Sequence, residues 1–249
     1  MLEKLMCKRL MKFIEKNKLL SQSQYGFRKN RSTELAIIEL TNKISKAIDQ
    51  GQYTIGVFLD LSKAFDTINH EILIQKLQHY GIRGIALEWF SNYLTNRKQI
   101  VKYKQTQSQE MVLKTGVPQG SILGPILFLL YINDIENCSK LLSFILFADD
   151  TTVFHSNRCL KTLNTTIQHE LSKVEEWLNV NKLSLNIKKT KFILFRSSNK
   201  KPKLDIKINI SNVKIEITKS TTFLGIVIDE SLTWKDHINK VAKLITKAS

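Results

Sequence analysis

The chain has 249 residues and a formal net charge of +16, because 38 lysines and arginines face 22 aspartates and glutamates. Hydrophobic residues make up 43% of the chain and charged residues 24%, which is typical of a globular protein with a core. The positive surplus indicates a polyanionic partner, with nucleic acid as the first candidate and an anionic membrane surface as the second. A basic protein without any such partner is the remaining alternative.

The sequence argues against a secretory leader, a membrane span and a zinc-binding motif. Residues 1–20 mix lysine, glutamate and leucine without an apolar centre. The longest apolar run, Ile122–Ile132, is too short to cross a membrane and contains a glycine and a proline. Three widely spaced cysteines form no zinc-type pair and predict reduced thiols in an intracellular protein: Cys7, Cys138 and Cys159.

Helical spacing of apolar residues predicts a series of amphipathic helices along the chain. The predicted helices span 2–18, 33–50, 69–80, 84–96, 160–178 and 234–248. Ser32 or Thr33 is the expected N-cap of the second helix, and Gly51 its stop. A more apolar helix is expected after the glycine-rich loop that begins at Thr115, and it runs to about Asn133.

Runs of β-branched and aromatic residues predict the strands. Single strands are expected at Tyr53–Leu61, Phe192–Phe195 and Thr222–Asp229. The last of these contains Gly225, where a second backbone is expected to approach closely. Two further hairpins are expected, one pairing Gln99–Lys104 with Gln109–Lys114 and one, exposed to solvent, within Lys200–Lys219.

Two adjacent acids, Asp149 and Asp150, lie at the centre of an apolar stretch, Leu141–Phe154. The pattern predicts a buried β-hairpin whose tight turn carries both carboxylates. Carboxylates this close repel one another unless a cation neutralises them, and Mg²⁺ prefers such oxygen ligands. The alternative is an ordinary turn, because aspartate is a common turn residue.

A third acid, Asp60, follows the apolar strand that starts at Tyr53. An acid at the exit of a strand is held in position while the loop beyond it stays accessible. If this strand and the Asp149 hairpin are neighbours in one sheet, the three carboxylates converge. Such a group would suit two-metal phosphoryl transfer.

Two loops and one lysine cluster are further candidates for binding. The loop Ser21–Thr33 places bases beside aromatic side chains, which suits nucleic acid, but a solvated loop is an open alternative. The loop Thr115–Phe128 is rich in glycine and carries Gln119, which suits the close approach of a substrate, or it is a plain junction before a helix. The lysines at 188, 189 and 191 lie before a strand, where a solvated charge run is the commoner explanation.

Six blocks in this order closely resemble the successive blocks of reverse transcriptases. They read QYGFRKNRST, FLDLSKAFDTINH, GVPQGSILGPILF, FADDT, LSLNIKKTKF and FLGIVID. The similarity is greatest to the polymerases of non-LTR, LINE-type, jockey-like retrotransposons of animals, and it runs from about Ser21 to Asp229. It implies an α+β right-hand polymerase fold, with helical fingers, an antiparallel palm and only the start of a thumb. The implied division is a reverse transcriptase domain over 1–233 and a truncated thumb over 234–249.

The resemblance implies an RNA-directed DNA polymerase that adds dNTPs to the 3′-OH of a DNA primer on an RNA template. Asp60, Asp149 and Asp150 would be its catalytic carboxylates, and they would hold two Mg²⁺ ions, or Mn²⁺ as a substitute, with the carbonyl of Leu61. Phe65 would be the steric gate that selects dNTPs over NTPs.

Other matching positions would bind substrates. Arg28 and Arg31 would hold the triphosphate, Gln119 and Gly120 would shape the nucleotide pocket, and Lys189 is a candidate general acid. The expected primer grip consists of Phe223, Leu224 and Gly225. The family further implies an intracellular location, in the nucleus and in a cytoplasmic ribonucleoprotein, without a membrane.

Because the chain ends one helix into the expected thumb, a fragment or a decayed copy of an element is also expected. A second hypothesis is therefore a non-catalytic remnant that binds nucleic acid. A third is a cellular polymerase of the same fold, of the telomerase-like or intron-maturase-like kind.

Overall fold

The computed structural model describes residues 2–95, 97–200 and 205–248. The chain forms two compact units, each built from separate stretches of sequence. Unit 1 consists of Met1–Gln22, Lys63–Asp134 and Leu178–Ser184, and unit 2 of Ser23–Ser62, Ile135–Trp177 and Leu185–Ser249. Each unit is described by itself below.

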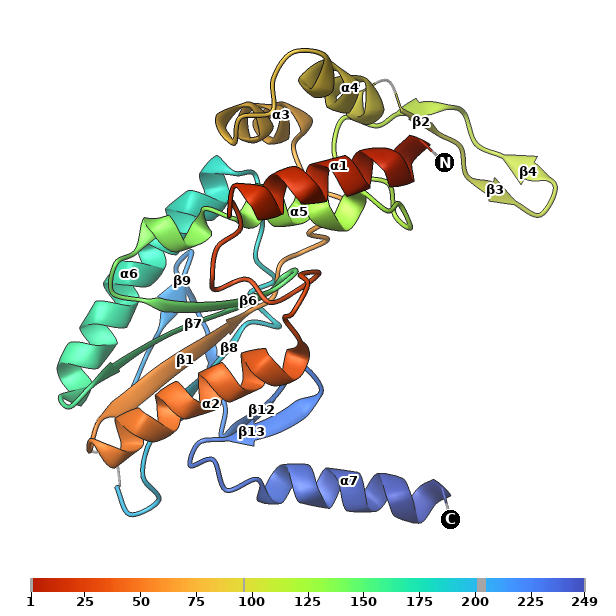
Figure 1. Ribbon diagram of the computed structural model, residues 1–249. Coiled ribbons are helices and arrows are strands. Elements are labelled where there is room, and N and C mark those ends of the chain that lie inside the picture. Colours follow the sequence, from red (N-terminus) through yellow and green to blue (C-terminus); the bar gives the residue numbers. More distant parts are fainter. Residues whose placement is uncertain (1, 96, 201–204, 249) are drawn as a thin grey trace. The chain divides into compact units, whose positions relative to one another are not determined.

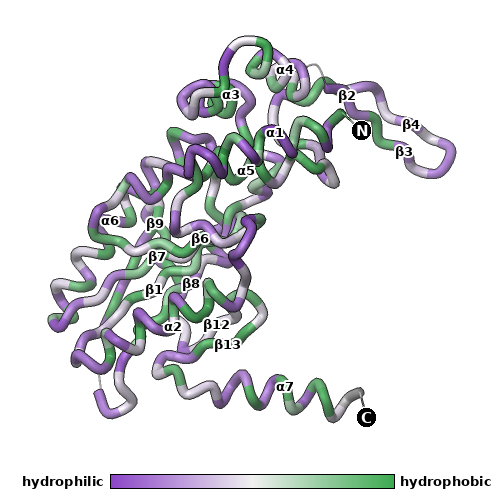
Figure 2. Tube along the Cα trace, in the orientation of Figure 1, coloured by the Kyte–Doolittle hydropathy of each residue, from purple (hydrophilic) through white to green (hydrophobic). Residues whose placement is uncertain are grey.

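Unit 2 is organised around a five-stranded sheet in the order β11-β8-β1-β7-β6. Its strands are β1 (Tyr53–Leu59), β6 (Ser143–Phe147), β7 (Asp150–Asn157), β8 (Lys191–Phe195) and β11 (Glu216–Ile217). The four longer strands pair antiparallel, and only β11 runs parallel to its neighbour β8. Apolar residues predominate in β1, β6 and β8, as the hydropathy colouring shows (Figure 2). The predicted hairpin and the predicted strands before Asp60 and at Phe192 are confirmed, but the turn carries only Asp149, because Asp150 is already the first residue of β7.

One helix, α2 (Thr33–Asp49), covers one face of this sheet (Figure 1). Ser32 is its N-cap and accepts a hydrogen bond from the backbone N–H of Leu35, which satisfies a donor that the first turn leaves open. The helix buries an apolar stripe together with residues from the sheet and from the C-terminal hairpin. This core contains Tyr25, Ala36, Ile37, Leu40, Ile44, Ile145, Phe154, Ile193, Phe195, Phe223 and Ile228.

The long helix α6 (Leu160–Val180) buries its own apolar stripe, as its spacing predicts. The buried residues are Leu163, Ile167, Leu171, Val174 and Leu178. Beside it lies the hairpin β9 (Asn209–Ile210) and β10 (Val213–Lys214), since Gln168 exchanges two hydrogen bonds with the backbone of Asn209. A 3₁₀ turn, η1 (Ile135–Cys138), lies in the connection before β6.

The stretch Lys200–Lys219 contains a hairpin as expected, but the expectation that it is exposed is wrong. Its first part, 201–204, lies outside the described residues, and the rest forms the short β9–β10 hairpin and then β11. Four isoleucines in this stretch are buried: Ile206, Ile208, Ile210 and Ile215. Alternating basic and β-branched residues are typical of a strand that buries one face. The lysines lie on the other face, and they led to the prediction that the whole segment is exposed.

The expectation of a single strand over Thr222–Asp229 is also wrong. The segment is a hairpin of β12 (Ser220–Phe223) and β13 (Ile226–Asp229), joined by Leu224 and Gly225. Both turn residues have positive φ, 46° and 90°, as tight hairpin turns require. A Cβ added at Gly225 would meet nothing within 4 Å, so this glycine serves the turn and not a close backbone approach.

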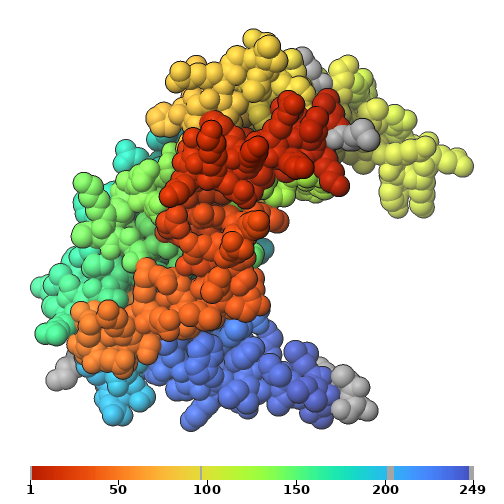
Figure 3. Space-filling model, viewed as in Figure 1, coloured from red at the N-terminus to blue at the C-terminus, as the bar shows by residue number. Residues whose placement is uncertain are grey.

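The chain continues from this hairpin into α7 (Lys235–Ala248), which packs against β13. In the space-filling view, the blue surface of this C-terminal segment adjoins the orange surface of α2 (Figure 3). Apolar and polar residues alternate along α7 (Figure 2), and several of its apolar side chains are exposed: Ile238, Val241, Leu244 and Ile245.

Unit 1 is mainly helical. Its helices are α1 (Leu2–Lys16), α3 (His70–His79), α4 (Ile85–Leu94) and α5 (Gly124–Ile132). Apart from Pro125, every residue of α5 is buried, which fits its uninterrupted apolar sequence.

The predicted hairpin in unit 1 is present as a ribbon with two short ladders. β2 (Lys98–Gln99) pairs with β5 (Met111–Val112), and β3 (Lys102–Tyr103) pairs with β4 (Thr106–Gln107). Within the part of the chain that the structure describes, no helix is both long and apolar enough to traverse a bilayer.

Candidate active site

The three acids come together at one end of the sheet in unit 2. Strands β1 and β7 are antiparallel neighbours, and the last residues paired between them are Leu59 and Thr151. Asp60 follows Leu59, and Asp150 precedes Thr151, so the next position along the same ladder places these two acids side by side. The predicted convergence of the two strands is confirmed.

The turn between β6 and β7 presents the third acid. Phe147 pairs with Asp150, which leaves Ala148 and Asp149 as the two turn residues. Ala148 has a φ of 56°, a left-handed conformation that alanine adopts only where its surroundings enforce it. Ala148 is buried, whereas Asp149 is exposed, so the turn is anchored on one side and offers a carboxylate to solvent on the other.

The electrostatics of the site show that the carboxylates act on one another. Protein atoms around its carboxyl raise the pKa of Asp150, and the charges of Asp149 and Asp60 raise it further. Like charges at close range disfavour ionisation of Asp150. The arrangement is therefore one that a cation would stabilise.

Hard oxygen donors and mutual repulsion fit a divalent ion such as Mg²⁺. Among the residues that the structure describes, no three His, Cys, Asp or Glu side chains already stand in a closed metal-binding arrangement. The donors that fit the ion are the carboxylates of Asp60, Asp149 and Asp150, and the expected fourth donor, the carbonyl of Leu61, follows Asp60 directly.

The backbone of Asp60 is held on both sides by the segment that precedes β8. Its N–H donates to Oγ1 of Thr190 over 3.4 Å, and its carbonyl accepts from the N–H of Asn186 over 2.8 Å. Asn186 also begins the turn that contains Lys189, whose N–H donates to the carbonyl of Asn186. The exposed Lys189 thus lies on the turn that is fixed to the backbone of Asp60.

Arg28 and Arg31 lie in the loop that leads into α2. Nη1 of Arg28 donates to the carbonyl of Gln24 over 3.1 Å, and the guanidinium of Arg31 lies 4.6 Å from the ring centre of Tyr25. Partial burial, followed by the charge of Arg31, lowers the pKa of Arg28. Two guanidinium groups that repel one another form a favourable environment for an anion.

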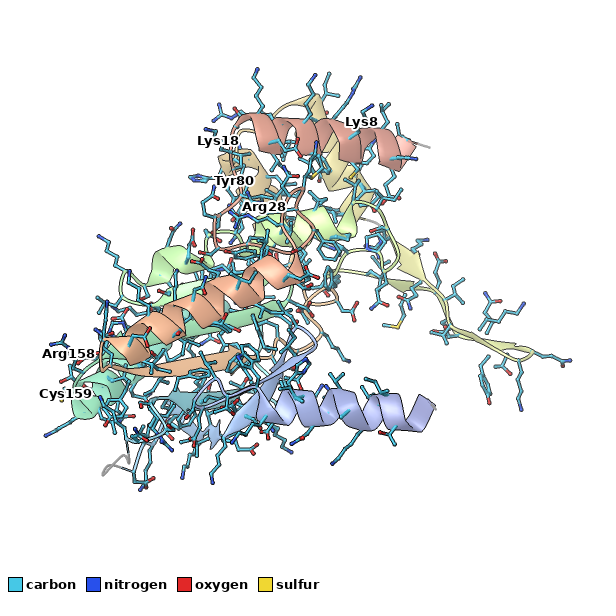
Figure 4. All side chains as sticks on the ribbon, turned by 60° about the horizontal axis from the view of Figure 1, so that its bottom comes forward. Lys8, Lys18, Arg28, Tyr80, Arg158 and Cys159 are labelled. Atoms are coloured by element: carbon cyan, nitrogen blue, oxygen red, sulfur yellow. The ribbon has the colours of Figure 1, made fainter. Side chains whose placement is uncertain are left out.

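Arg28 lies at the acidic end of unit 2 because its loop contacts the β6–β7 turn. Figure 4 labels Arg28 and, at the far end of β7, Arg158 and Cys159. These last two residues therefore belong to the opposite end of the sheet from the carboxylates.

Phe65, Gln119 and Gly120 belong to unit 1. The ring of Phe65 packs in a tilted arrangement against that of Phe128, with centroids 4.6 Å apart. The main-chain carbonyl of Phe65 accepts a hydrogen bond from the N–H of Val117. Gln119 and Gly120 are exposed, and Gly120 has a φ of 77° with open space around its Cα. The glycine-rich loop thus lies against the backbone that carries Phe65.

The expected primer grip in unit 2 is the β12–β13 turn. Phe223 is buried against α2 and the sheet, and its ring lies 5.9 Å from that of Phe58 on β1. Leu224 and Gly225 form the tight turn beyond it. The turn is therefore tied to the central sheet through Phe223.

Two residues that hold the acids in place were not predicted from the sequence: Thr190, at Asp60, and Gln24, whose Oε1 accepts from the N–H of Ala148. Both are buried polar residues. The neighbouring residues in the sequence do not predict these contacts, because the partners lie more than a hundred residues away.

Comparison with known proteins agrees with this geometry. Residues 1–228 match the family model described as reverse transcriptase (RNA-dependent DNA polymerase). The chain is 28% identical to the probable RNA-directed DNA polymerase from transposon BS of Drosophila melanogaster, over 97% of this chain and 27% of that protein. It is 25% identical to the RNA-directed DNA polymerase from mobile element jockey of Drosophila funebris, with the same two coverages.

The chain therefore spans about a quarter of the length of these relatives. Among solved structures, telomerase from Candida tropicalis in complex with the TWJ fragment of telomeric RNA is similar with a TM-score of 0.59 and 16% identity. That match covers 94% of this chain and 36% of the telomerase chain. The expected α+β polymerase fold and the resemblance to jockey-like elements are confirmed.

Proposed function

Because this chain belongs to the reverse transcriptase (RNA-dependent DNA polymerase) family, we propose that it is the polymerase domain of a non-LTR mobile element. It would extend a DNA primer with dNTPs on an RNA template. The observation that carries this proposal is the meeting of Asp60 with the Asp149–Asp150 turn at the ends of β1 and β7. The net charge of +16 suits the dense phosphate of a template–primer duplex.

Asp60, Asp149 and Asp150 would hold two Mg²⁺ ions, with the carbonyl of Leu61 as a further ligand and Mn²⁺ as a substitute. Bound there, the metal would lower the pKa of the primer 3′-OH and neutralise charge on the triphosphate. The role of the chain is to fix the carboxylates. β1 and β7 set the spacing between Asp60 and Asp150, and the tight turn exposes Asp149.

Two groups of residues would bind the nucleotide. In unit 2, Arg28 and Arg31 would hold the triphosphate, and Lys189 would donate a proton to the leaving pyrophosphate. In unit 1, Phe65 would exclude the ribose 2′-OH, while Gln119 and Gly120 would contact the incoming nucleotide.

The remaining assignments belong to the same proposal. Phe223, Leu224 and Gly225 would contact the primer, residues 1–233 would form fingers and palm, and 234–249 would begin a thumb. The protein would act in the nucleus and travel in a cytoplasmic ribonucleoprotein.

The test is primer extension on an RNA template with dNTPs and Mg²⁺. Asp149→Asn removes a carboxylate charge from the turn and is expected to abolish extension, while salt-sensitive RNA binding stays close to that of the unmodified chain. The matched control is Glu39→Gln, which makes the same chemical change at an exposed acid whose partner is Lys43 on the surface of α2. Extension by Asp149→Asn at the unmodified rate would contradict the proposal.

The competing function is that of a non-catalytic remnant that binds nucleic acid. A chain that has lost polymerase activity would still have the basic surface that binds phosphate. RNA binding without extension by the unmodified chain, even with Mn²⁺, would favour this alternative.

A further inference from the structure

The loop before α2 is joined to the strand that leads into the acidic turn. The N–H of Tyr25 donates to the carbonyl of Leu146 over 2.7 Å, and the N–H of Leu146 donates to the carbonyl of Ser23 over 2.8 Å. Gln24 and Leu146 thereby form a parallel bridge. Residues 23–25 therefore extend the sheet beside β6, just before the turn at Ala148.

A buried side-chain oxygen then reaches the turn itself. Oε1 of Gln24 accepts from the N–H of Gly26 over 2.7 Å and from the N–H of Ala148 over 3.2 Å. Gln24 is only 1% exposed, so water does not compete for these two donors. Ala148 is the turn residue with left-handed backbone geometry, and the next residue is Asp149.

The same loop is in steric contact with the turn. A Cβ added at Gly26 would lie 2.4 Å from the backbone nitrogen of Ala148, a distance that real atoms do not adopt. Gly26 has an ordinary φ, so it is the lack of a side chain that matters here, not backbone freedom. Loop and turn therefore fit together without a gap.

The choice of glutamine at position 24 is informative. Its Nε2 is buried, and no hydrogen-bond partner for it is found within the described chain. A buried donor without a partner is destabilising, so packing alone would favour an apolar side chain of the same length. A glutamate would supply the acceptor but would add a buried negative charge beside three acids. Glutamine supplies a neutral acceptor for the two backbone donors.

We propose that Gln24 is a positioning residue for the polymerase reaction, which holds the Ala148–Asp149 turn so that the carboxylate of Asp149 faces Asp60. Its main-chain carbonyl also accepts from Arg28, so one residue links the acidic turn to the arginine that would bind the triphosphate. This inference rests on the proposed function, because it concerns how the same carboxylates are arranged.

The test compares four variants with the unmodified chain. Gln24→Met keeps the length of the side chain and removes the acceptor, Gln24→Asn keeps the amide but withdraws it, and Gln24→Glu keeps the acceptor. The matched control is Gln168→Met, because Gln168 also holds a backbone segment through its amide, at Asn209 and away from the acids.

Mn²⁺ binding, measured by electron paramagnetic resonance titration, is the readout that does not depend on activity. Gln24→Met and Gln24→Asn are expected to weaken Mn²⁺ binding about fivefold to tenfold, as expected for loss of one hydrogen bond to the turn. In primer extension they are expected to lower kcat about tenfold or more, with the KM for dNTP within about twofold. Gln24→Glu keeps the acceptor but adds a buried negative charge beside the acids, so it should recover only part of the kcat. Gln168→Met should lower only the melting temperature.

The outcomes separate the inference from the proposed function. If the unmodified chain extends primers and Gln24→Met and Gln24→Asn lower only the melting temperature, the positioning role is wrong while the polymerase stands. If Mn²⁺ binding depends on Gln24 but the unmodified chain does not extend primers, the polymerase proposal fails and the positioning of the turn stands. Should Gln24→Met fail to fold, Gln24→Asn, the smaller change, decides the question.

Discussion

The side chain of Gln119 donates a hydrogen bond from Nε2 to Oδ1 of Asp66 over 2.8 Å. Asp66 directly follows Phe65, so the bond joins the two stretches of unit 1 that are expected to contact the nucleotide. The backbones of the two stretches also lie close together. A Cβ added at Gly116 would lie only 2.8 Å from the carbonyl oxygen of Asp66, and Gly116 has a φ of 83°, so a glycine is required there. We expect this contact to fix Gln119 for nucleotide binding.

Asp66→Ala removes the acceptor and should raise the KM for dNTP in primer extension about threefold to tenfold, the scale of one exposed hydrogen bond to a charged group. Asp66→Asn retains a side-chain oxygen and should stay within about twofold of the unmodified chain. An unchanged KM in Asp66→Ala would show that Gln119 does not depend on this contact.

Phe65 is the second test of nucleotide binding. Phe65→Ala removes the ring that packs against Phe128 and should relax the discrimination against the ribose 2′-OH. The ratio of ATP to dATP incorporation is expected to rise on the order of tenfold or more. Because both substrates are measured on one enzyme preparation, a general loss of activity cancels in the ratio. A ratio that stays constant would remove Phe65 from the role of steric gate.

Glu170 on α6 is a buried acid that is expected to stabilise unit 2. Its carboxylate is 1% exposed and accepts hydrogen bonds from Ser139 over 2.5 Å and from Lys173 over 2.6 Å. Burial opposes ionisation, but the bonds from Lys173 and Ser139 outweigh it and lower the pKa of Glu170. Glu170→Gln should therefore reduce the free energy of unfolding at pH 7 by about 1–3 kcal/mol.

The pH dependence follows from the direction of this shift. A folded-state pKa below the ordinary value of 4.5 means that ionised Glu170 contributes its full stabilisation above that value. The contribution is lost as the pH falls through the lowered folded-state pKa. Urea unfolding at pH 7 and near pH 4 should show the gap between Glu170→Gln and the unmodified chain shrinking in acid, whereas a constant gap would contradict the ionic role. The exposed Glu39→Gln should show no gap at either pH.

Asp229 fixes the entry into α7. Its carboxylate accepts from the backbone N–H groups of Ser231, Thr233 and Trp234 at 2.9–3.1 Å. Partial burial opposes ionisation, but these bonds lower the pKa of Asp229. Asp229→Ala should destabilise the attachment of α7 by about 1–2 kcal/mol, in the range of helix-capping losses.

Limited proteolysis measures this effect, with faster cleavage before α7 expected in Asp229→Ala. Ser231→Ala is the control, because it leaves the backbone donor of that residue in place. Equal cleavage rates in the two variants would mean that the carboxylate does not hold the helix.

Much of the local structure could be predicted from the residues themselves. Apolar spacing predicted α2 and α6, and the run before Asp60 predicted β1. These succeeded because helix and strand periods appear directly in the order of side chains. The hairpin within Lys200–Lys219 was predicted, but the burial of its isoleucines was not, because the lysines between them suggested exposure. The single strand expected over Thr222–Asp229 was wrong, because a two-residue turn interrupts the apolar run.

The family, the order of the blocks and the candidate acids could be read from residue type and from spacing along the chain. The position of β1 next to β7, with Leu59 opposite Thr151 and Asp60 therefore beside Asp150, follows only from the folded structure. The fold also reveals the hydrogen bonds from the N–H of Asp60 to Thr190 and from the N–H of Ala148 to Gln24. Such pairings join residues about ninety or more positions apart, and the register of the strands is fixed by the packing of the sheet, which no local pattern encodes.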